Sequence, residues 1–128
     1  MINKILERVY VGDSEYTRKN LDELGIHWVL NVGGKVTGHE DYHRHLTDDG
    51  NNTRIDIMDA VLQARQRILN GFTVLIHCRA GISRSPYIIA KHLESMGMDI
   101  FDAVEYVKEK HPMTQINQDL LHVEWSEK

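Results

Sequence analysis

The feature that most constrains the fold is an apolar segment that leads directly into a loop containing a cysteine and an arginine. Residues 72–76, Phe-Thr-Val-Leu-Ile, predict a fully buried strand. His77 and Cys78 follow this segment, and a short loop then reaches Arg84 and a helical pattern. The N–H groups of such a loop can point inward, and the dipole of the following helix adds positive potential. The sequence therefore predicts an anion-binding loop, residues 78–84, between a strand and a helix N-terminus.

The residue types in this loop fit the capture of a phosphate group by a reactive thiolate. A cysteine thiol has a pKa of about 8.5, which falls to roughly 3.5–7.5 at a helix N-terminus or beside cations, so Cys78 is a candidate nucleophile. The planar guanidinium of Arg84, after five intervening residues, can bind two phosphate oxygens. Gly81 lets the backbone approach a ligand closely, and Ser83 and Ser85 can hydrogen-bond within the loop or to the thiolate. An isolated cysteine is more often a small core residue, but these neighbours favour the catalytic interpretation.

The segment His77–Ser85, His-Cys-Arg-Ala-Gly-Ile-Ser-Arg-Ser, resembles the His-Cys-x5-Arg-Ser/Thr signature of cysteine-dependent protein tyrosine phosphatases. With Pro86 added, it is most similar to the dual-specificity phosphatase branch of that superfamily. The resemblance begins near Ile5 and covers most of the chain, because an apolar strand, a glycine, a helix and a Gly-Ile strand leading to Asn-Val also match. It implies a phosphatase that needs no metal or other cofactor.

The resemblance also assigns roles to the matching residues. Cys78 would attack phosphorus, and Ser85 would stabilise the thiolate when it leaves. His77 would orient the loop and help to hold the thiolate state. Phosphate oxygens would be bound by Arg84 and by the backbone N–H groups of Arg79, Ala80, Gly81, Ile82 and Ser83.

A second participant is needed because an alkoxide or phenoxide leaving group has to be protonated as it departs. Residues 47–52, Thr-Asp-Asp-Gly-Asn-Asn, form a polar loop where similar phosphatases carry their general acid. Asp48 follows Leu46 by two positions, as the family's acid follows its last apolar strand residue, so we expect Asp48 to be the acid. Asp49 is the alternative, and a turn role for both stays open because Asp-Gly is a common turn signal.

Strands and helices alternate along the chain, which favours an α/β fold with a mainly parallel sheet. The resemblance implies the same arrangement, a central sheet flanked by helices of the protein tyrosine phosphatase type. We expect a single minimal dual-specificity phosphatase catalytic domain over residues 1–128. The expected strands are residues 5–11, 26–32, 42–46 and 72–76, and the expected helices are residues 14–24, 53–69, 86–96, 99–111 and 115–125.

Capping residues support several of these boundaries. Asp13 or Ser14 can cap the first helix, Thr53 the second and Asp99 the fourth. Asn117 corresponds to an asparagine of the relatives and is a candidate brace for the anion-binding loop. The apolar faces of the second and third helices are expected to contain Ile57, Met58, Val61, Leu62, Ile68, Leu69, Ile88, Ile89, His92, Leu93 and Met96.

Composition argues against several other classes of protein. The formal net charge of −4 disfavours a nucleic-acid binder, including an RNA 5′-phosphatase. No apolar run reaches the roughly 18 residues of a membrane span, so no membrane association is expected. The single cysteine excludes an internal disulfide and suits a reducing compartment, which predicts a cytoplasmic protein. His43 and His45 share one face of a strand, but we interpret them as surface histidines and expect no metal site.

The expected function is hydrolysis of phosphotyrosine and phosphoserine or phosphothreonine in phosphorylated proteins, through a phosphocysteine intermediate. One alternative is a phosphoinositide or other non-protein phosphatase. Arg79 beside Cys78 supports that reading, but Ile82 stands where such enzymes usually have a second basic residue. The other alternative is a catalytically weak phosphate-binding module, although such proteins usually lose the nucleophile or the acid. The sequence indicates neither the oligomeric state nor the physiological substrate.

Overall fold

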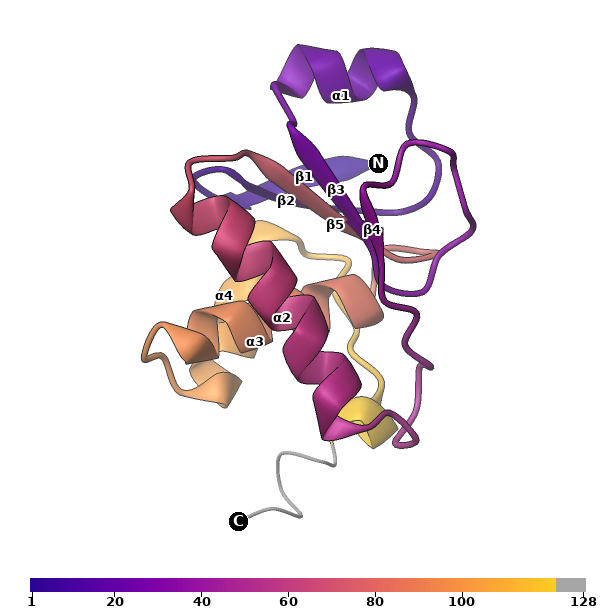
Figure 1. Ribbon diagram of the computed structural model, residues 1–128. Coiled ribbons are helices and arrows are strands. Elements are labelled where there is room, and N and C mark those ends of the chain that lie inside the picture. The colour runs from indigo at the N-terminus through magenta and orange to yellow at the C-terminus, as the bar shows by residue number, and fades with distance from the viewer. Residues whose placement is uncertain (122–128) are drawn as a thin grey trace.

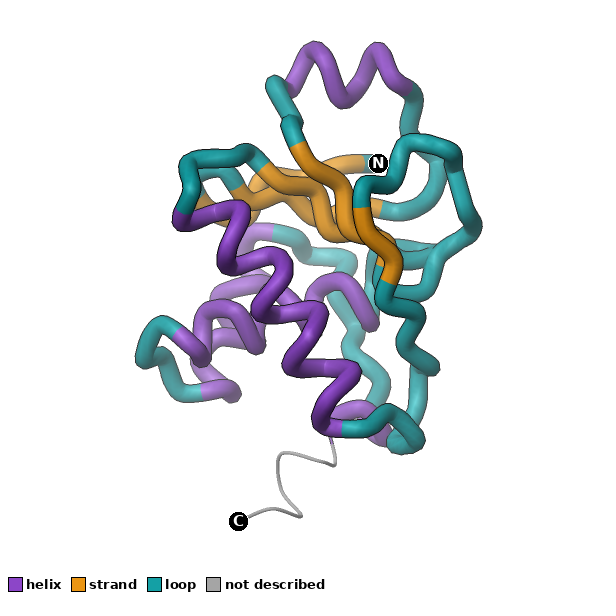
Figure 2. The backbone as a smooth tube through the Cα atoms, in the orientation of Figure 1, coloured by secondary structure: helices purple, strands orange, loops and turns teal. Residues whose placement is uncertain are grey.

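The computed structural model describes residues 1–121 and contains a five-stranded sheet between helices (Figures 1 and 2). The order across the sheet is β1-β2-β5-β3-β4, so β5 lies in the centre. Only β1 and β2 pair antiparallel, which confirms the mainly parallel α/β sheet. The strands are β1 (Ile2–Leu6), β2 (Val9–Gly12), β3 (Trp28–Asn31), β4 (Tyr42–His43) and β5 (Val74–His77).

Helices α1 to α4 of the described residues divide between the two faces of the sheet (Figure 1). Helix α1 (Arg18–Leu24) covers one face, where Leu21 packs with Val29 and Leu75. The other three helices, α2 (Arg54–Leu69), α3 (Arg84–Ser95) and α4 (Ile100–Lys110), cover the opposite face and enclose the larger core. None of the helices within residues 1–121 is long and apolar enough to cross a lipid bilayer.

Three predicted elements at the N-terminal half differ from the structure. The expected strand 5–11 is a hairpin, because Arg8 adopts a left-handed backbone with φ of 65° and reverses the chain between β1 and β2. Helix α1 begins after Thr17 rather than after Asp13 or Ser14, because Thr17 and Asn20 form a reciprocal capping box. Strand β4 ends at His43, two residues into the expected strand.

The remaining boundaries agree more closely. Thr53 and Asp99 cap α2 and α4 as expected, each accepting a backbone N–H with its side chain. Helical backbone resumes at residue 118, later than the predicted 115, and residues 122–125 of that predicted helix lie outside the described residues. Four of the side chains predicted to be inward are exposed instead, namely Met58, Leu62, Leu69 and Met96. The core positions of α2 are instead filled in part by Ala60 and Ala64.

Candidate active site

Carbonyl groups of the loop after β5 accept hydrogen bonds from residues outside the loop, and this orients the N–H groups of the loop. A trans peptide is planar, so a carbonyl that points away from the site directs the next N–H toward it. Ser14 holds two of these peptide groups by hydrogen bonds. Its hydroxyl donates to the Cys78 carbonyl and its N–H donates to the Arg79 carbonyl, both at 3.3 Å. The N–H groups of Arg79 and Ala80 therefore face the inside of the anion-binding loop.

The later half of the loop is held by hydrogen bonds from the C-terminal part of the chain. Nε2 of His111 lies 2.7 Å from the Gly81 carbonyl, and the N–H of Gln115 donates to the Ile82 carbonyl at 2.7 Å. Gly81 has a positive φ of 71°, and any side chain there would collide with the backbone of Gly12. The sequence pattern predicts a glycine here for close approach of a ligand, whereas in the structure the φ of Gly81 and its contact with Gly12 already require a glycine.

Cys78 lies at the start of this loop, 2% exposed, with its Sγ 3.2 Å from Oγ of Ser85. Ser85 is the second residue of α3, so its hydroxyl and the N-terminal end of the helix dipole both lie beside the Cys78 sulfur. Gly34 packs directly against the Cys78 carbonyl carbon, where a Cβ would come within 2.8 Å. The predicted nucleophile and its predicted hydroxyl partner are therefore in contact.

The Arg84 side chain reaches the far side of the loop and is held there by backbone. Its Nη1 donates to the Leu46 carbonyl at 2.9 Å, and its guanidinium covers Gly33, where no side chain would fit. Its Nε is buried and has no acceptor among the described residues. Buried donors are normally paired, so this N–H fits an oxygen of a bound anion.

Asp48 and Asp49 point to different places, although they are adjacent. Asp48 is exposed and accepts a hydrogen bond at 2.5 Å from the Ser83 hydroxyl, which belongs to the anion-binding loop. Asp49 instead accepts from Thr47 and Asn51 of its own loop, and these hydrogen bonds lower the pKa of Asp49. Asp48 therefore faces the candidate nucleophile's loop, and Asp49 stabilises the turn.

Asn117 contacts the same serine through its backbone rather than its side chain. Its backbone N–H donates to Oγ of Ser83 at 2.9 Å, while its side chain accepts from the N–H of Asp119. A groove beside the loop is lined by Asp48, Ile82, Ser83 and residues 115–119. The backbone of this segment thus braces Ser83 and forms one wall of the approach to the site.

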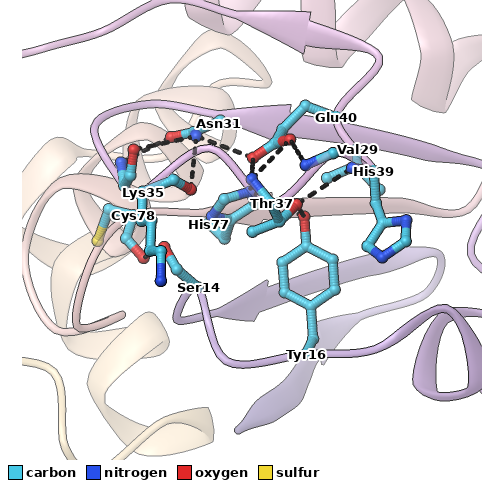
Figure 3. A network of polar contacts seen from close by, with 12 residues as sticks. Ser14, Tyr16, Val29, Asn31, Lys35, Thr37, His39, Glu40, His77 and Cys78 are labelled. Carbon is cyan, nitrogen blue, oxygen red and sulfur yellow. Dashed lines mark hydrogen bonds and ion pairs between the residues drawn. The ribbon is translucent and has the colours of Figure 1, made fainter.

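His77, directly before Cys78, belongs to a buried polar network (Figure 3). Its Nε2 lies 3.0 Å from the Tyr16 hydroxyl and 3.3 Å from Oε2 of Glu40, whose side chain is only 1% exposed. Burial lowers the pKa of His77, an effect that the negative charge of Glu40 opposes. Burial also raises the pKa of Tyr16 to about 12, so this hydroxyl keeps its proton.

Glu40 stays ionised although it is buried. Burial alone would raise its pKa, but hydrogen bonds from Thr37 and Asn31 prevail and hold the pKa of Glu40 at about 2. Asn31 also accepts the N–H groups of Gly33 and Gly34, at 2.9 and 2.6 Å. One buried network therefore fixes both the histidine before the nucleophile and the two glycines that pack on the site.

No group of three or more histidine, cysteine, aspartate or glutamate side chains suited to a metal ion occurs within residues 1–121. His43 and His45 are both exposed, in agreement with their interpretation as surface residues. The groups that surround the anion-binding loop are a thiol, a guanidinium, loop amides and a nearby carboxylate.

Comparison with known proteins assigns the family. A model of the dual specificity phosphatase catalytic domain matches residues 9–123. The chain belongs to the dual-specificity phosphatase family. A solved structure of a mouse putative dual specificity phosphatase has the same fold, with a TM-score of 0.84 over 94% of this chain and 82% of that one, at 17% identity.

Two curated relatives of this family member are much longer proteins. Protein phosphatase Slingshot of Drosophila melanogaster is 30% identical over 93% of this chain but only 12% of its own length. Dual specificity protein phosphatase 1 of Homo sapiens is also 30% identical, over 89% of this chain and 34% of its own length. The chain thus spans a small part of the curated relatives that it matches.

The sequence did not identify the roles of Ser14, Tyr16, Asn31, Glu40 and His111 at the site. Ser14 and His111 contact the loop from positions 64 and 30 residues away in the sequence. Glu40 acts on His77, and Asn31 acts on Glu40 and on the two glycines. A partial signal existed for Asn31, because Asn-Val before a glycine pair was part of the family resemblance. Nothing in the sequence pattern distinguishes Glu40 from its exposed acidic neighbours.

Proposed function

We propose that this chain is a cysteine-dependent phosphatase that hydrolyses phosphomonoesters through a phosphocysteine intermediate. One observation carries the proposal above the others. Cys78 begins a loop in which four carbonyls, those of residues 78, 79, 81 and 82, are hydrogen-bonded to groups outside the loop. The N–H groups that follow these carbonyls are therefore directed to where a phosphate would contact Sγ. Such convergence stabilises the negative charge of a phosphoryl group during transfer.

In the first step the Cys78 thiolate attacks phosphorus and the bond to the leaving oxygen breaks. Asp48 gives its proton to that oxygen, so that an alcohol or phenol departs rather than an alkoxide or phenoxide. The equatorial oxygens are bound by Arg84 and by the N–H groups of residues 79–83. The Nε of Arg84, which has no other acceptor among the described residues, supplies one of these hydrogen bonds.

In the second step water attacks the phosphocysteine. The ionised Asp48 takes a proton from this water, the S–P bond breaks, and inorganic phosphate is released. The hydroxyl of Ser85, 3.2 Å from Sγ, donates a hydrogen bond to the departing thiolate of Cys78. His77, held by Tyr16 and Glu40, keeps the start of the loop in position for both steps.

Phosphorylated proteins are the proposed substrates, with phosphotyrosine and phosphoserine or phosphothreonine both accepted. The groove beside the loop contributes two carboxylates, from Asp48 and Asp119, and no lysine or arginine among the described residues that line it. Such a groove would repel the additional phosphates of a phosphoinositide headgroup more than it would repel a peptide. The names of the relatives favour the same substrate class.

The test is phosphate release from p-nitrophenyl phosphate, from a phosphotyrosine peptide and from a phosphoinositide, all in EDTA. The wild-type chain should be compared with Cys78→Ser and with His45→Ala, which replaces an exposed histidine that has no part in the proposed mechanism. We expect turnover for wild type and His45→Ala and none for Cys78→Ser. Faster turnover of the phosphoinositide than of the peptide would reassign the substrate class. An inert wild type that still binds phosphopeptide would replace the enzyme with a binding module.

A further inference from the structure

His111 occupies a fixed position between the anion-binding loop and the first strand. It is 1% exposed and follows the last residue of α4, where its N–H donates to the Val107 carbonyl at 2.8 Å. Its own carbonyl accepts from both the N–H and the hydroxyl of Thr114, at 2.9 and 2.6 Å. Hydrogen bonds therefore hold the backbone of His111 on both sides, and this restricts the orientation of its ring.

The two neighbours of the ring determine where its proton lies. Nε2 is 2.7 Å from the Gly81 carbonyl, which can only accept, so Nε2 carries the hydrogen. Nδ1 of the neutral ring is then an acceptor, and it lies 2.7 Å from the Asn3 side-chain amide, which donates to it. Both nitrogens of this buried histidine are thus satisfied, in contrast to His92, whose two ring nitrogens have no partner among the described residues.

We propose that Asn3 and His111 are positioning residues for phosphate binding. By holding the Gly81 carbonyl outward, His111 directs the Ile82 N–H into the anion-binding loop, because the two groups share one planar peptide. Asn3 orients the His111 ring for this task. The inference rests on the proposed phosphatase function and adds two residues to it.

Asn3 gives this arrangement a second consequence. It lies on the edge strand β1, before residue 9, where the match to the family model begins. The hairpin of β1 and β2 therefore contributes to the phosphate site through the contact of Asn3 with His111. This contribution is separate from the addition of β1 to the edge of the sheet. Removing Asn3 should weaken phosphate binding although the residue itself cannot touch a ligand in the loop.

The test is a titration of the chain with inorganic phosphate, followed by the amide NMR signal of Ile82, which requires no turnover. His111→Ala should weaken phosphate binding by about tenfold, since a hydrogen bond to a charged group is lost, and should reduce the shift of the Ile82 amide at saturation. His111→Gln should restore most of both, because its amide can donate to the Gly81 carbonyl. His92→Ala removes an equally buried histidine and should leave phosphate affinity unchanged. Asn3→Ala, a milder change on an edge strand, should weaken binding by a few fold and serves if His111→Ala does not fold.

Three outcomes would overturn the inference while the wild type binds phosphate normally. The first is wild-type affinity in His111→Ala or, should that variant not fold, in Asn3→Ala. The second is a glutamine variant that binds no better than the alanine variant. The third is equal weakening by His92→Ala, which would mean that any buried-histidine deletion acts through stability. A wild type that binds no phosphate at all would instead contradict the proposed function.

Discussion

Ser83 donates its hydroxyl hydrogen to the Asp48 carboxylate across 2.5 Å, so the loop that carries Asp48 is tied to the anion-binding loop. Ser83 is itself held, because its oxygen accepts the N–H of Asn117 at 2.9 Å. This arrangement places Asp48 beside the site before any substrate arrives. Asp49, by contrast, is occupied with hydrogen bonds inside its own turn.

Replacing Asp48 should therefore reveal the general acid. Asp48→Asn keeps the acceptor for Ser83 but removes the proton, so hydrolysis of phenyl phosphate, whose leaving group is poor, should slow by about 10²–10⁴-fold. Hydrolysis of p-nitrophenyl phosphate should slow much less, because its leaving group needs little protonation. Initial rates on both substrates at matched pH measure the contrast.

Asp49→Asn is the matched control for that experiment. Because hydrogen bonds hold the pKa of Asp49 low, it remains ionised and is poorly suited to give up a proton at neutral pH. We expect the same modest loss on both substrates, through a looser turn. A loss in Asp49→Asn that is large on phenyl phosphate alone would move the acid from Asp48 to Asp49.

Gly33 should be required for the position of Arg84. Gly33 has φ of 151°, and a Cβ there would lie 2.7 Å from Cζ of Arg84, so Gly33→Ala should displace the guanidinium. We expect turnover of p-nitrophenyl phosphate to fall by at least about tenfold, because a hydrogen bond to the phosphoryl group is lost.

Gly38→Ala controls for backbone strain in the same loop. Gly38 also has a positive φ, of 89°, but a Cβ there would meet nothing within 4 Å. Both variants should lose about 1–3 kcal/mol of unfolding free energy from strain, and only Gly33→Ala should lose activity. Equal activity losses would show that loop strain, rather than contact with Arg84, is responsible.

Local patterns predicted those parts of the site that are contiguous in sequence. Residues 77–85 specify a strand end, a turn and a helix start together, so Cys78, Arg84 and Ser85 could be placed before the structure was known. The sheet followed from the alternation of strands and helices. The assignment of one domain to residues 1–128 stays a prediction.

The boundary of the first strand was predicted wrongly because one pattern of apolar residues fits two backbone conformations. Ile5, Val9 and Val11 all face inward, as in one strand, but a left-handed Arg8 divides that strand into a hairpin. The contribution of Glu40 could not be predicted, because its role depends on contact with His77, which lies 37 positions later at the end of β5. Only the three-dimensional fold makes that carboxylate a buried one.

Stability should fall as the pH drops below neutrality, and His92 should contribute to this. Burial lowers the pKa of His92, and the positive charge of Arg65 lowers it further. Above an unfolded pKa of about 6.5 both states are neutral and the stability is fully present; below it the unfolded chain takes up a proton that the folded state resists. The loss for one such group is at most about 1.4 kcal/mol per pH unit.

His92→Leu should flatten this dependence. Urea unfolding at pH 7.5 and pH 5.5 should give a smaller difference in unfolding free energy for the variant than for wild type. Some dependence should remain, because the pKa of His77 is also lowered by burial. His45→Leu, at an exposed position, should keep the full wild-type difference. If His92→Leu keeps it as well, His92 is not the responsible group.

Glu40 should control stability in a lower pH range. Its pKa is about 2 in the folded chain, against an ordinary value of 4.5, so its contribution is fully present above about pH 4.5 and is lost as the pH falls from there toward 2. Glu40→Gln should abolish this part of the acid dependence. It should also cost about 1–3 kcal/mol at pH 7, because an amide nitrogen cannot accept from the N–H groups of Thr37 and Gly38 as a carboxylate oxygen does.

Urea unfolding at pH 7, 4.5 and 3 measures both effects of Glu40→Gln. Glu23→Gln, which alters a surface carboxylate with 60% of its side chain exposed, is the control and should behave as wild type. The loss of unfolding free energy between pH 4.5 and pH 3 should be smaller in Glu40→Gln than in the wild type or in Glu23→Gln. An unchanged loss would mean that the carboxylate is not the group that titrates, and the network around His77 would then owe its acid sensitivity to another residue.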